Sequence, residues 1–223
     1  ICKQLGISRT IHSEEYQDDG EPYLLSKENV RGADVFVVSS LYNCDKERLS
    51  DKVVNLLFFA RSLRDASAER ITLVMPYMAY QRQDRKTAPR APVYTKYLPE
   101  QVEGLLGKDT VRVLTMDVHN LSAFQSGWRC CVDHLEAKTL VANWISNFYN
   151  DLDLENFVVC SPDEGGVKRT VFYRDKLSQA LGVELGLAAI WKNRNKKDLK
   201  TYGVMGDVRG KQVALFDDMI ATG

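Results

Sequence analysis

Short apolar runs recur along the chain at intervals that suit alternating strands and helices. Six runs have strand length and consist mostly of β-branched or otherwise apolar residues. They are residues 35–38, 71–75, 111–116, 157–160, 187–190 and 213–216. Because runs this apolar leave no polar face, they predict strands in sheets that are covered on both sides.

Between the runs, apolar residues repeat at intervals of three and four, which is the spacing of one face of a helix. One repeat consists of Leu49, Val53, Leu56, Ala60 and Leu63, and a second consists of Tyr173, Leu177, Ala180 and Leu181. Pro99 falls inside a third helical segment, residues 93–106. Proline in a helix interior costs about 3 kcal/mol, so this helix is expected to start or kink there. Alternating strands and helices predict a mainly parallel α/β architecture.

Composition excludes several classes of protein. The 30 Lys and Arg residues balance 30 Asp and Glu residues, so no overall field favours nucleic acid or an anionic membrane as a partner. No apolar stretch approaches the roughly 18 to 20 residues that cross a bilayer, and no signal peptide is evident. Five cysteines without C-x-x-C spacing argue against a disulfide framework or a zinc site. A soluble, cytoplasmic protein is expected.

Domain boundaries are weakly marked, since no linker composition interrupts the chain. A boundary is expected near residues 133–137, which gives an N-terminal domain of residues 1–135 and a C-terminal domain of residues 136–223. Residue 1 reads as part of a helix already under way, and residue 223 follows a strand-to-loop transition after which a helix is usual. Both features suggest part of a longer chain.

Polar side chains follow five of the six runs. In open α/β sheets ligands bind beyond the carboxyl ends of the strands, so these positions are candidates for chemistry. After the second run comes a dense group of donors with one carboxylate, namely Arg82, Gln83, Asp84, Arg85 and Lys86. Arginine can bind phosphate through two parallel hydrogen bonds, and Gln or Asp can hydrogen-bond to a base or a ribose. A solvated surface loop is the alternative.

The third and fourth runs are followed by possible metal or phosphate ligands. Asp117 and His119 come two residues apart on an extended segment, so they point the same way and suit one site, although a structural histidine is the alternative. Asp163 stands before two glycines at a strand-to-helix turn, where the backbone can approach an anion. Asp163 could hold magnesium or cap the helix, and both interpretations stay open.

The last two clusters are cationic and acidic. Lys192 and Arg194 bracket one residue and could neutralise charge on transferring phosphates, although charge runs are often only solvated. Asp217 and Asp218 can accept hydrogen bonds from two sugar hydroxyls, and the small residues beyond them can present N–H groups to a phosphate. A helix N-cap is the alternative. Neither a P-loop nor a G-x-G-x-x-G motif occurs, so a nucleotide must be held some other way.

With these clusters in this order, residues 17–223 resemble the ribose-phosphate pyrophosphokinases. Two further segments carry the resemblance: Glu28-Asn-Val-Arg-Gly-Ala-Asp-Val-Phe36 and Gly206-Asp-Val-Arg-Gly210. The resemblance implies two tandem domains of the type I phosphoribosyltransferase fold, the C-terminal one incomplete. It also implies a transferase of nucleotide biosynthesis, which moves the β,γ-diphosphoryl group of Mg-ATP to the 1-hydroxyl of ribose 5-phosphate and releases AMP.

The resemblance also assigns roles to individual residues and implies a homo-hexamer built from dimers. The implied ATP site consists of Arg82, Gln83, Asp84, Arg85 and His119, with Asp19 and Glu21 lent by a neighbouring subunit. Magnesium is implied beside His119 and Asp163, and transition-state stabilisation by Lys192 and Arg194. Ribose 5-phosphate is implied to bind Asp217, Asp218, Thr222 and Gly223. A non-catalytic regulatory homologue and a phosphoribosyltransferase are the alternatives.

Two departures from the family's usual pattern bear on the nucleotide. The lent loop usually carries an aromatic residue followed by Ser-Asp-Gly-Glu, whereas this chain reads Tyr16-Gln-Asp-Asp-Gly-Glu21. The residue that stacks on adenine is therefore not identified. Asn193 stands between Lys192 and Arg194, where the family commonly has a basic residue.

Overall fold

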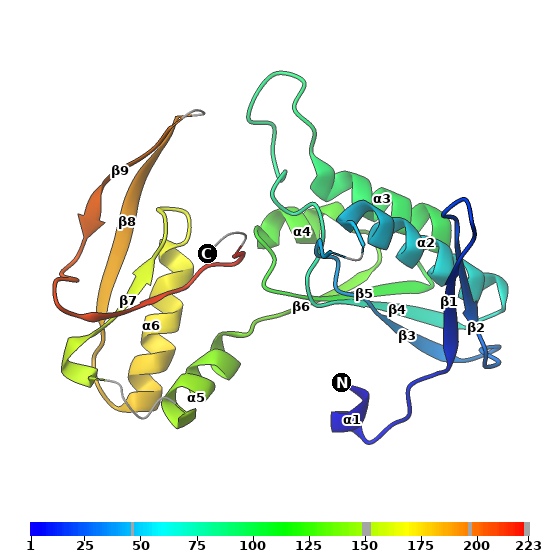
Figure 1. Cartoon of the computed structure of the whole chain (residues 1–223), viewed down its shortest axis with the longest axis horizontal. Helices are drawn as coiled ribbons and strands as arrows, with labels where there is room; N and C mark the ends of the chain where they lie inside the picture. The colour runs from blue at the N-terminus through cyan, green and yellow to red at the C-terminus, as the bar shows by residue number, and fades with distance from the viewer. Residues whose placement is uncertain (46, 149–152, 196–197, 221–223) are drawn as a thin grey trace. The chain divides into compact units, whose positions relative to one another are not determined.

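The computed structural model describes residues 1–45, 47–148, 153–195 and 198–220, and of residues 148, 192–195 and 198–202 it describes the backbone. The chain divides into two compact units, residues 1–135 and residues 136–223. Each unit has its own sheet and its own buried core (Figure 1). Within the described ranges, no helix combines the length and the hydropathy that a membrane span requires.

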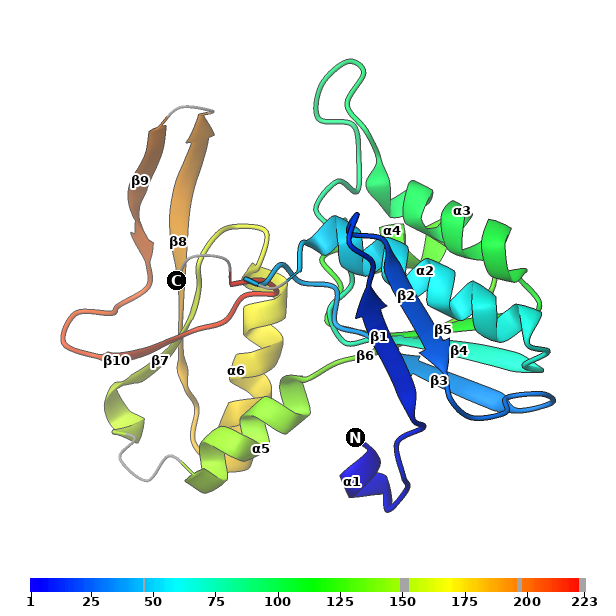
Figure 2. The same cartoon turned by 45° about the vertical axis from the view of Figure 1, so that its right-hand side comes forward.

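Unit 1 contains an antiparallel hairpin and a four-stranded, all-parallel sheet with the strand order β3-β4-β5-β6. Strand β2 of the hairpin packs on helix α2 (Figure 2). The elements are α1 (Cys2–Leu5), β1 (His12–Tyr16), β2 (Pro22–Ser26), β3 (Asp34–Val38), α2 (Leu49–Asp65), β4 (Arg70–Met75), α3 (Tyr94–Leu106), β5 (Val111–Met116), α4 (Leu121–Gly127) and β6 (Cys131–Leu135).

Unit 2 contains a four-stranded sheet with the order β10-β7-β8-β9, in which only the β8–β9 pair is antiparallel. All six apolar runs therefore form strands, and the predicted mainly parallel α/β architecture is confirmed. The elements are α5 (Lys138–Phe148), a 3-10 turn η1 (Leu154–Asn156), β7 (Phe157–Ser161), α6 (Val167–Leu181), β8 (Gly186–Asn195), β9 (Asp198–Met205) and β10 (Gln212–Leu215).

The core of unit 1 lies on one face of its sheet, where α2 and α3 pack (Figure 1). Ile71 and Met75 of β4 are at most 1% exposed there. The other face carries Phe36, Val38 and Leu135, which are 61%, 50% and 47% exposed. The prediction that the sheet is covered on both faces is wrong for the described part of unit 1. Consecutive strands are neighbours, and right-handed crossovers between neighbouring strands bring their helices to the same face.

Pro99 lies inside α3, which begins at Tyr94 rather than at the proline. The helix therefore does not start at Pro99, which is buried within it, and a kink there, the other expected outcome, stays a prediction. Proline lacks the N–H group that would bond the Thr95 carbonyl. That carbonyl faces the end of α4, where a Cβ atom on Gly127 would lie 2.5 Å from its oxygen. Glycine at position 127 therefore permits α4 to approach the interrupted turn of α3.

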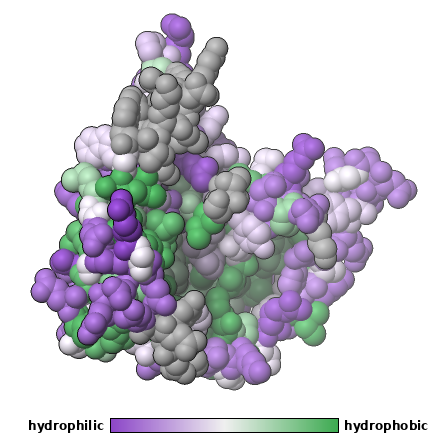
Figure 3. All heavy atoms as spheres, turned by 60° about the vertical axis from the view of Figure 1, so that its left-hand side comes forward, coloured by the Kyte–Doolittle hydropathy of each residue, from purple (hydrophilic) through white to green (hydrophobic). Residues whose placement is uncertain are grey.

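The core of unit 2 lies mainly between its sheet and helices α5 and α6. Tyr173 and Leu177, both predicted on the apolar face of a helix, are buried there, and the Tyr173 ring stacks on Phe216 with centroids 4.3 Å apart. Val213 and Leu215 of β10 remain 42% and 59% exposed. Hydrophobic side chains are accordingly visible at the surface among hydrophilic ones (Figure 3).

Candidate functional site

The loop between β4 and α3 carries the first predicted cluster. Arg82, Gln83 and Arg85 are exposed, whereas the side chain of Asp84 is only 11% exposed. The Gln83 carbonyl accepts hydrogen bonds from the backbone N–H and the hydroxyl of Thr95, both at 3.4 Å. These bonds anchor the loop to the start of α3, and the guanidinium groups of the loop are exposed to solvent.

The loops that follow β4 and β5 emerge side by side. The two strands are parallel neighbours in which Met75 pairs with Thr115, and the Thr115 hydroxyl donates to the Met75 carbonyl at 2.8 Å. Carboxyl ends of parallel strands lie at one edge of a sheet, which is where ligands bind in open α/β folds. The cluster around Arg82 and the turn that carries His119 therefore share this edge.

The turn after β5 has a constrained backbone. Asp117 has φ +45°, an uncommon value for a residue with a side chain. Its N–H donates to the Leu135 carbonyl at 3.0 Å, and the Val118 N–H donates to His134 Nε2 at 3.2 Å. Uncommon backbone conformations of this kind cluster at functional sites. The exposed His119 follows directly.

Asn120 joins the two clusters of unit 1, although sequence reasoning did not single it out. Its Nδ2 donates to Asp84 Oδ2 at 2.7 Å, and its Oδ1 accepts the N–H of Ala123 at 3.1 Å, which caps α4. The only signal in the sequence is that asparagine is a favoured N-cap. The structure thus brings Asp84 next to the turn of His119.

Asp19 and Glu21 lie in the turn of the β1–β2 hairpin. Asp19 Oδ1 accepts the Glu21 N–H at 3.1 Å, so the described bonds of these residues stay within the hairpin and none reaches the Arg82 loop. Asn55 of α2 donates to the Tyr16 hydroxyl at 3.4 Å and so links the hairpin to the helix. Tyr16 is 58% exposed, which leaves this aromatic face and the two acids at the surface of unit 1.

In unit 2, Asp163 closes the turn between β7 and α6. Its Oδ1 accepts the Gly166 N–H at 3.0 Å, and its carbonyl accepts the Ser161 hydroxyl at 2.7 Å. A Cβ atom on Gly166 would lie 2.7 Å from Ser161 Oγ, so glycine is required at this close approach. Gly166 is the N-cap of α6, and no side chain caps this helix, so the capping role considered for Asp163 is wrong and its bond closes the preceding turn instead. The magnesium role stays a prediction.

Asp217 and Asp218 follow β10 at the edge where β7 ends, because β10 pairs in parallel with β7. Arg169 of α6 donates to Asp218 Oδ1 at 2.8 Å and lies 3.9 Å from Asp217 Oδ1. The Asp218 side chain is 7% exposed. Burial, the hydrogen bond with Asp218 and the charges of Asp218 and Asp163 raise the pKa of Asp217. The three carboxylates therefore form one electrostatic cluster.

Candidate magnesium ligands do not form a complete protein cage. Among the described residues, no group of three or more His, Cys, Asp or Glu side chains is arranged to hold a metal ion. His119 and Asp163, the expected ligands, belong to different units. Magnesium in phosphate-transferring sites is usually held by one or two carboxylates together with substrate phosphates and water. The oxygen-rich cluster of unit 2 fits that chemistry.

Lys192 and Arg194 lie in strand β8, which runs to Asn195. The expectation that they stand in a loop after the strand is wrong, because antiparallel pairing with β9 extends the strand past its apolar part, with an irregularity after Trp191. The side chains of these two cations lie outside the described part of the chain. Thr222 and Gly223, expected in the phosphate loop, also lie outside it.

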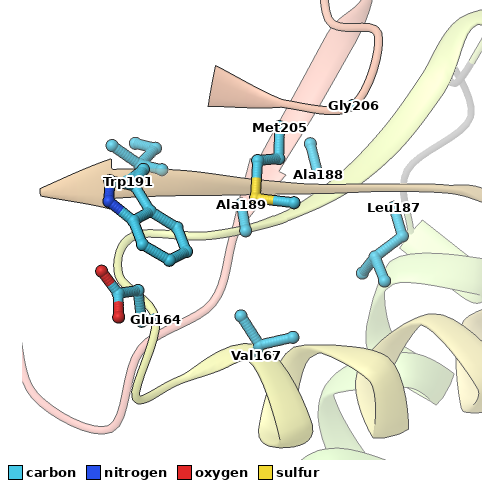
Figure 4. A pocket seen from close by; sticks show the side chains of 9 residues that line it. Glu164, Val167, Leu187, Ala188, Ala189, Trp191, Met205 and Gly206 are labelled. Atoms are coloured by element: carbon cyan, nitrogen blue, oxygen red, sulfur yellow. The ribbon is translucent and has the colours of Figure 1, made fainter. Parts of the chain in front are cut away.

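A groove of about 440 Å³ opens beside the start of α6 (Figure 4). Its walls are almost entirely apolar, and Glu164 is the one ionisable side chain among the residues that line it. Val167 of α6 and Trp191 of β8 face each other across it (Figure 4). The residues that line the groove include no cation, so it lacks the charged groups that bind phosphate most strongly.

The fold and the two clusters define an α/β protein with charged sites at the carboxyl edges of its parallel strands, the class in which such edges bind ligands. Comparison with known proteins identifies the family. Residues 1–104 match the family model for the N-terminal domain of ribose phosphate pyrophosphokinase. The chain is 37% identical over its whole length to the putative ribose-phosphate pyrophosphokinase 2 of Lactiplantibacillus plantarum and covers 64% of that relative.

Two further comparisons agree. The chain is 35% identical over its whole length to the ribose-phosphate pyrophosphokinase of Agrobacterium fabrum, of which it covers 67%. The crystal structure of phosphoribosylpyrophosphate synthetase from Mycobacterium smegmatis superposes with a TM-score of 0.81 at 31% identity, over 100% of this chain and 67% of that one. The chain therefore belongs to the ribose-phosphate pyrophosphokinase family. It spans slightly less than two thirds of the length of several curated relatives, including 59% of one from Clostridium acetobutylicum.

Proposed function

We propose that this chain belongs to a ribose-phosphate diphosphokinase, which transfers the β,γ-diphosphoryl group of Mg-ATP to ribose 5-phosphate and gives phosphoribosyl pyrophosphate and AMP. The observation that carries the proposal is the pair of unlike charged clusters at two sheet edges. One is rich in guanidinium groups and the other in carboxylates. Membership of the family supports the same activity.

The nucleotide half of the proposal belongs to residues 1–135. Exposed Arg82 and Arg85 suit the phosphates of ATP because guanidinium groups bind phosphate oxygens bidentately. Gln83 and Asp84 offer polar groups to the base or the ribose. His119 directly precedes Asn120, which donates to Asp84, and this supports a role for His119 close to the same nucleotide.

The sugar half belongs to residues 136–223. Asp217 and Asp218 are acceptors for ribose hydroxyls, and the Arg169 guanidinium holds Asp218 in place from the next helix. Asp163 stands in the same electrostatic cluster. Magnesium bound there would supply charge neutralisation for the diphosphate. Thr222 and Gly223 would complete the site as donors to the 5-phosphate.

The transfer step needs positioning and charge neutralisation rather than a covalent enzyme intermediate. The ribose 1-hydroxyl oxygen attacks the β-phosphorus of ATP, the bond from that phosphorus to the oxygen bridging to the α-phosphate breaks, and AMP leaves with that oxygen. The proton of the 1-hydroxyl is lost to solvent or a nearby base. Lys192 and Arg194 would stabilise the negative charge on the diphosphoryl group as it moves.

A homo-hexamer built from dimers completes the proposal. Asp19 and Glu21 are acids on an exposed hairpin turn whose described hydrogen bonds are internal. They are therefore suited to act in the ATP site of a neighbouring subunit. A cytoplasmic location and the absence of nucleic acid or membrane partners are part of the same proposal, in line with the balanced charge of the chain.

The decisive experiment measures AMP and phosphoribosyl pyrophosphate formed from ATP and ribose 5-phosphate by the complete protein, with and without magnesium. Magnesium-dependent formation of both products supports the proposal. Binding of both substrates without AMP release would indicate a non-catalytic homologue instead. Consumption of phosphoribosyl pyrophosphate with a nucleobase, without ATP binding, would indicate a phosphoribosyltransferase.

A further inference from the structure

We propose that Asn120 is a positioning residue that holds Asp84, and with it the Arg82–Arg85 segment, in the conformation that receives the nucleotide. This inference rests on the proposed function for the identity of the ligand. Its structural basis is the single side chain of Asn120, which bonds the loop after β4 on one side and helix α4, directly after the His119 turn, on the other.

An amide is the side chain that meets both demands at this position. The Ala123 N–H requires an acceptor, which fixes Asn120 Oδ1 toward the helix at 3.1 Å. The amide NH₂ then faces Asp84 Oδ2 at 2.7 Å, and a carboxylate requires a donor there. Aspartate would cap the helix equally well, but it would set a second negative charge against Asp84. Alanine would lose both bonds.

The bond has a consequence for the charge of the loop. The Asp84 side chain is 11% exposed, and a polar group buried to this extent needs a hydrogen-bond partner. Asn120 supplies that partner without adding charge. Arg85 lies 3.9 Å away on the side of the other carboxylate oxygen, and its own side chain is 79% exposed. The guanidinium groups of Arg82 and Arg85 remain exposed, where a polyphosphate can reach them.

The anchor also couples the loop to the turn of His119. Asn120 directly follows His119, and its backbone carbonyl accepts the N–H of Phe124, a core residue that is 1% exposed. The position of Asn120 is therefore fixed by α4 and by the core. The fixed Asn120 side chain in turn fixes the position of Asp84. Binding sites are commonly held in this way, by residues whose own rotamers are locked by neighbouring bonds.

The test compares Asn120→Asp and Asn120→Ala with the wild-type complete protein. Asn120→Asp keeps the helix cap and replaces the donor to Asp84 by a like charge. We expect it to raise KM for ATP about tenfold, the size expected from losing one hydrogen bond to a charged group, and to leave KM for ribose 5-phosphate unchanged. Backbone amides in residues 81–93 should exchange hydrogen faster without any ligand. Asn120→Ala should add a loss of thermal stability.

Asn156→Asp is the matched control, because Asn156 Nδ2 donates to Asp153 Oδ2 at the same 2.7 Å distance but lies in the other unit, outside the proposed sites. It should leave both KM values and the exchange of residues 81–93 unchanged. The proposal is overturned if Asn120→Asp matches the wild type in KM for ATP and in exchange, or raises both KM values equally. If the wild type forms no AMP, the proposed function fails, and the exchange comparison alone still decides whether Asn120 holds Asp84.

Discussion

Replacement of Arg169 by methionine tests how the acidic pair of unit 2 is held together. The change keeps an unbranched side chain but removes the donor to Asp218 Oδ1 at 2.8 Å. A hydrogen bond to a charged group is worth about 1.5–3 kcal/mol, and breaking a fully buried ion pair costs about 3–5 kcal/mol. Because the Asp218 side chain is 7% exposed and that of Arg169 is 25% exposed, we expect an intermediate loss of about 2–3 kcal/mol.

The assay is a double-mutant cycle in urea denaturation. Trp144 and Trp191 belong to unit 2, so a Trp128→Phe background confines the fluorescence signal to that unit. If Asp218 is destabilised by losing the guanidinium, Asp218→Asn in the Arg169→Met protein should recover part of the stability, with a coupling free energy of about 1–2 kcal/mol. Costs that add to within about 0.5 kcal/mol would refute the reasoning, since they are typical of independent sites.

Three further predictions concern packing and ionisation. Gly127→Ala should lower stability by about 1–3 kcal/mol in thermal melts, because the new Cβ would lie 2.5 Å from the Thr95 carbonyl oxygen. Asp217→Asn should stabilise unit 2 at neutral pH, because burial and neighbouring acids raise the pKa of Asp217 and so penalise its charged form. That gain in stability should vanish as pH falls below the ordinary pKa of 3.8. The same Asp217→Asn substitution should abolish the affinity for ribose 5-phosphate. Burial raises the pKa of Cys130 to about 12, so iodoacetamide should modify exposed Cys131 first, as peptide mass mapping can show.

The strands were largely predictable, because each buried parallel strand reads as an apolar run. The hairpin strands, β6 and β9 lie outside the six runs and were missed. β1 consists of polar residues and β6 alternates at the edge of its sheet, so neither leaves a continuous apolar signal. The extension of β8 to Asn195 depends on a partner strand. Which face a helix covers follows from strand order, which local sequence does not encode.

Candidate residues at strand ends were predictable, whereas the residues that hold them were not. The rule that ligands bind beyond the carboxyl ends of strands pointed to Asp84 and Asp218 directly. Asn120 and Arg169 reach them across 36 and 49 residues of sequence. No periodicity or motif links such distant positions, because the bonds exist only once neighbouring strands have fixed their loops side by side.

Asn120 and Arg169 also explain why the sheet edge of each unit would receive a different ligand under the proposed function. In unit 1 a neutral amide holds Asp84, so the surrounding segment, with Arg82, Arg85 and Lys86, keeps an excess of positive charge. In unit 2 a guanidinium holds Asp218, while Asp217, Asp218 and Asp163 form one electrostatic cluster. The first balance favours a polyphosphate, and the second favours hydroxyl groups and a divalent cation. A guanidinium at position 120 would pair with Asp84 but add charge beside it, whereas the amide fixes the loop and leaves its charge to the nucleotide.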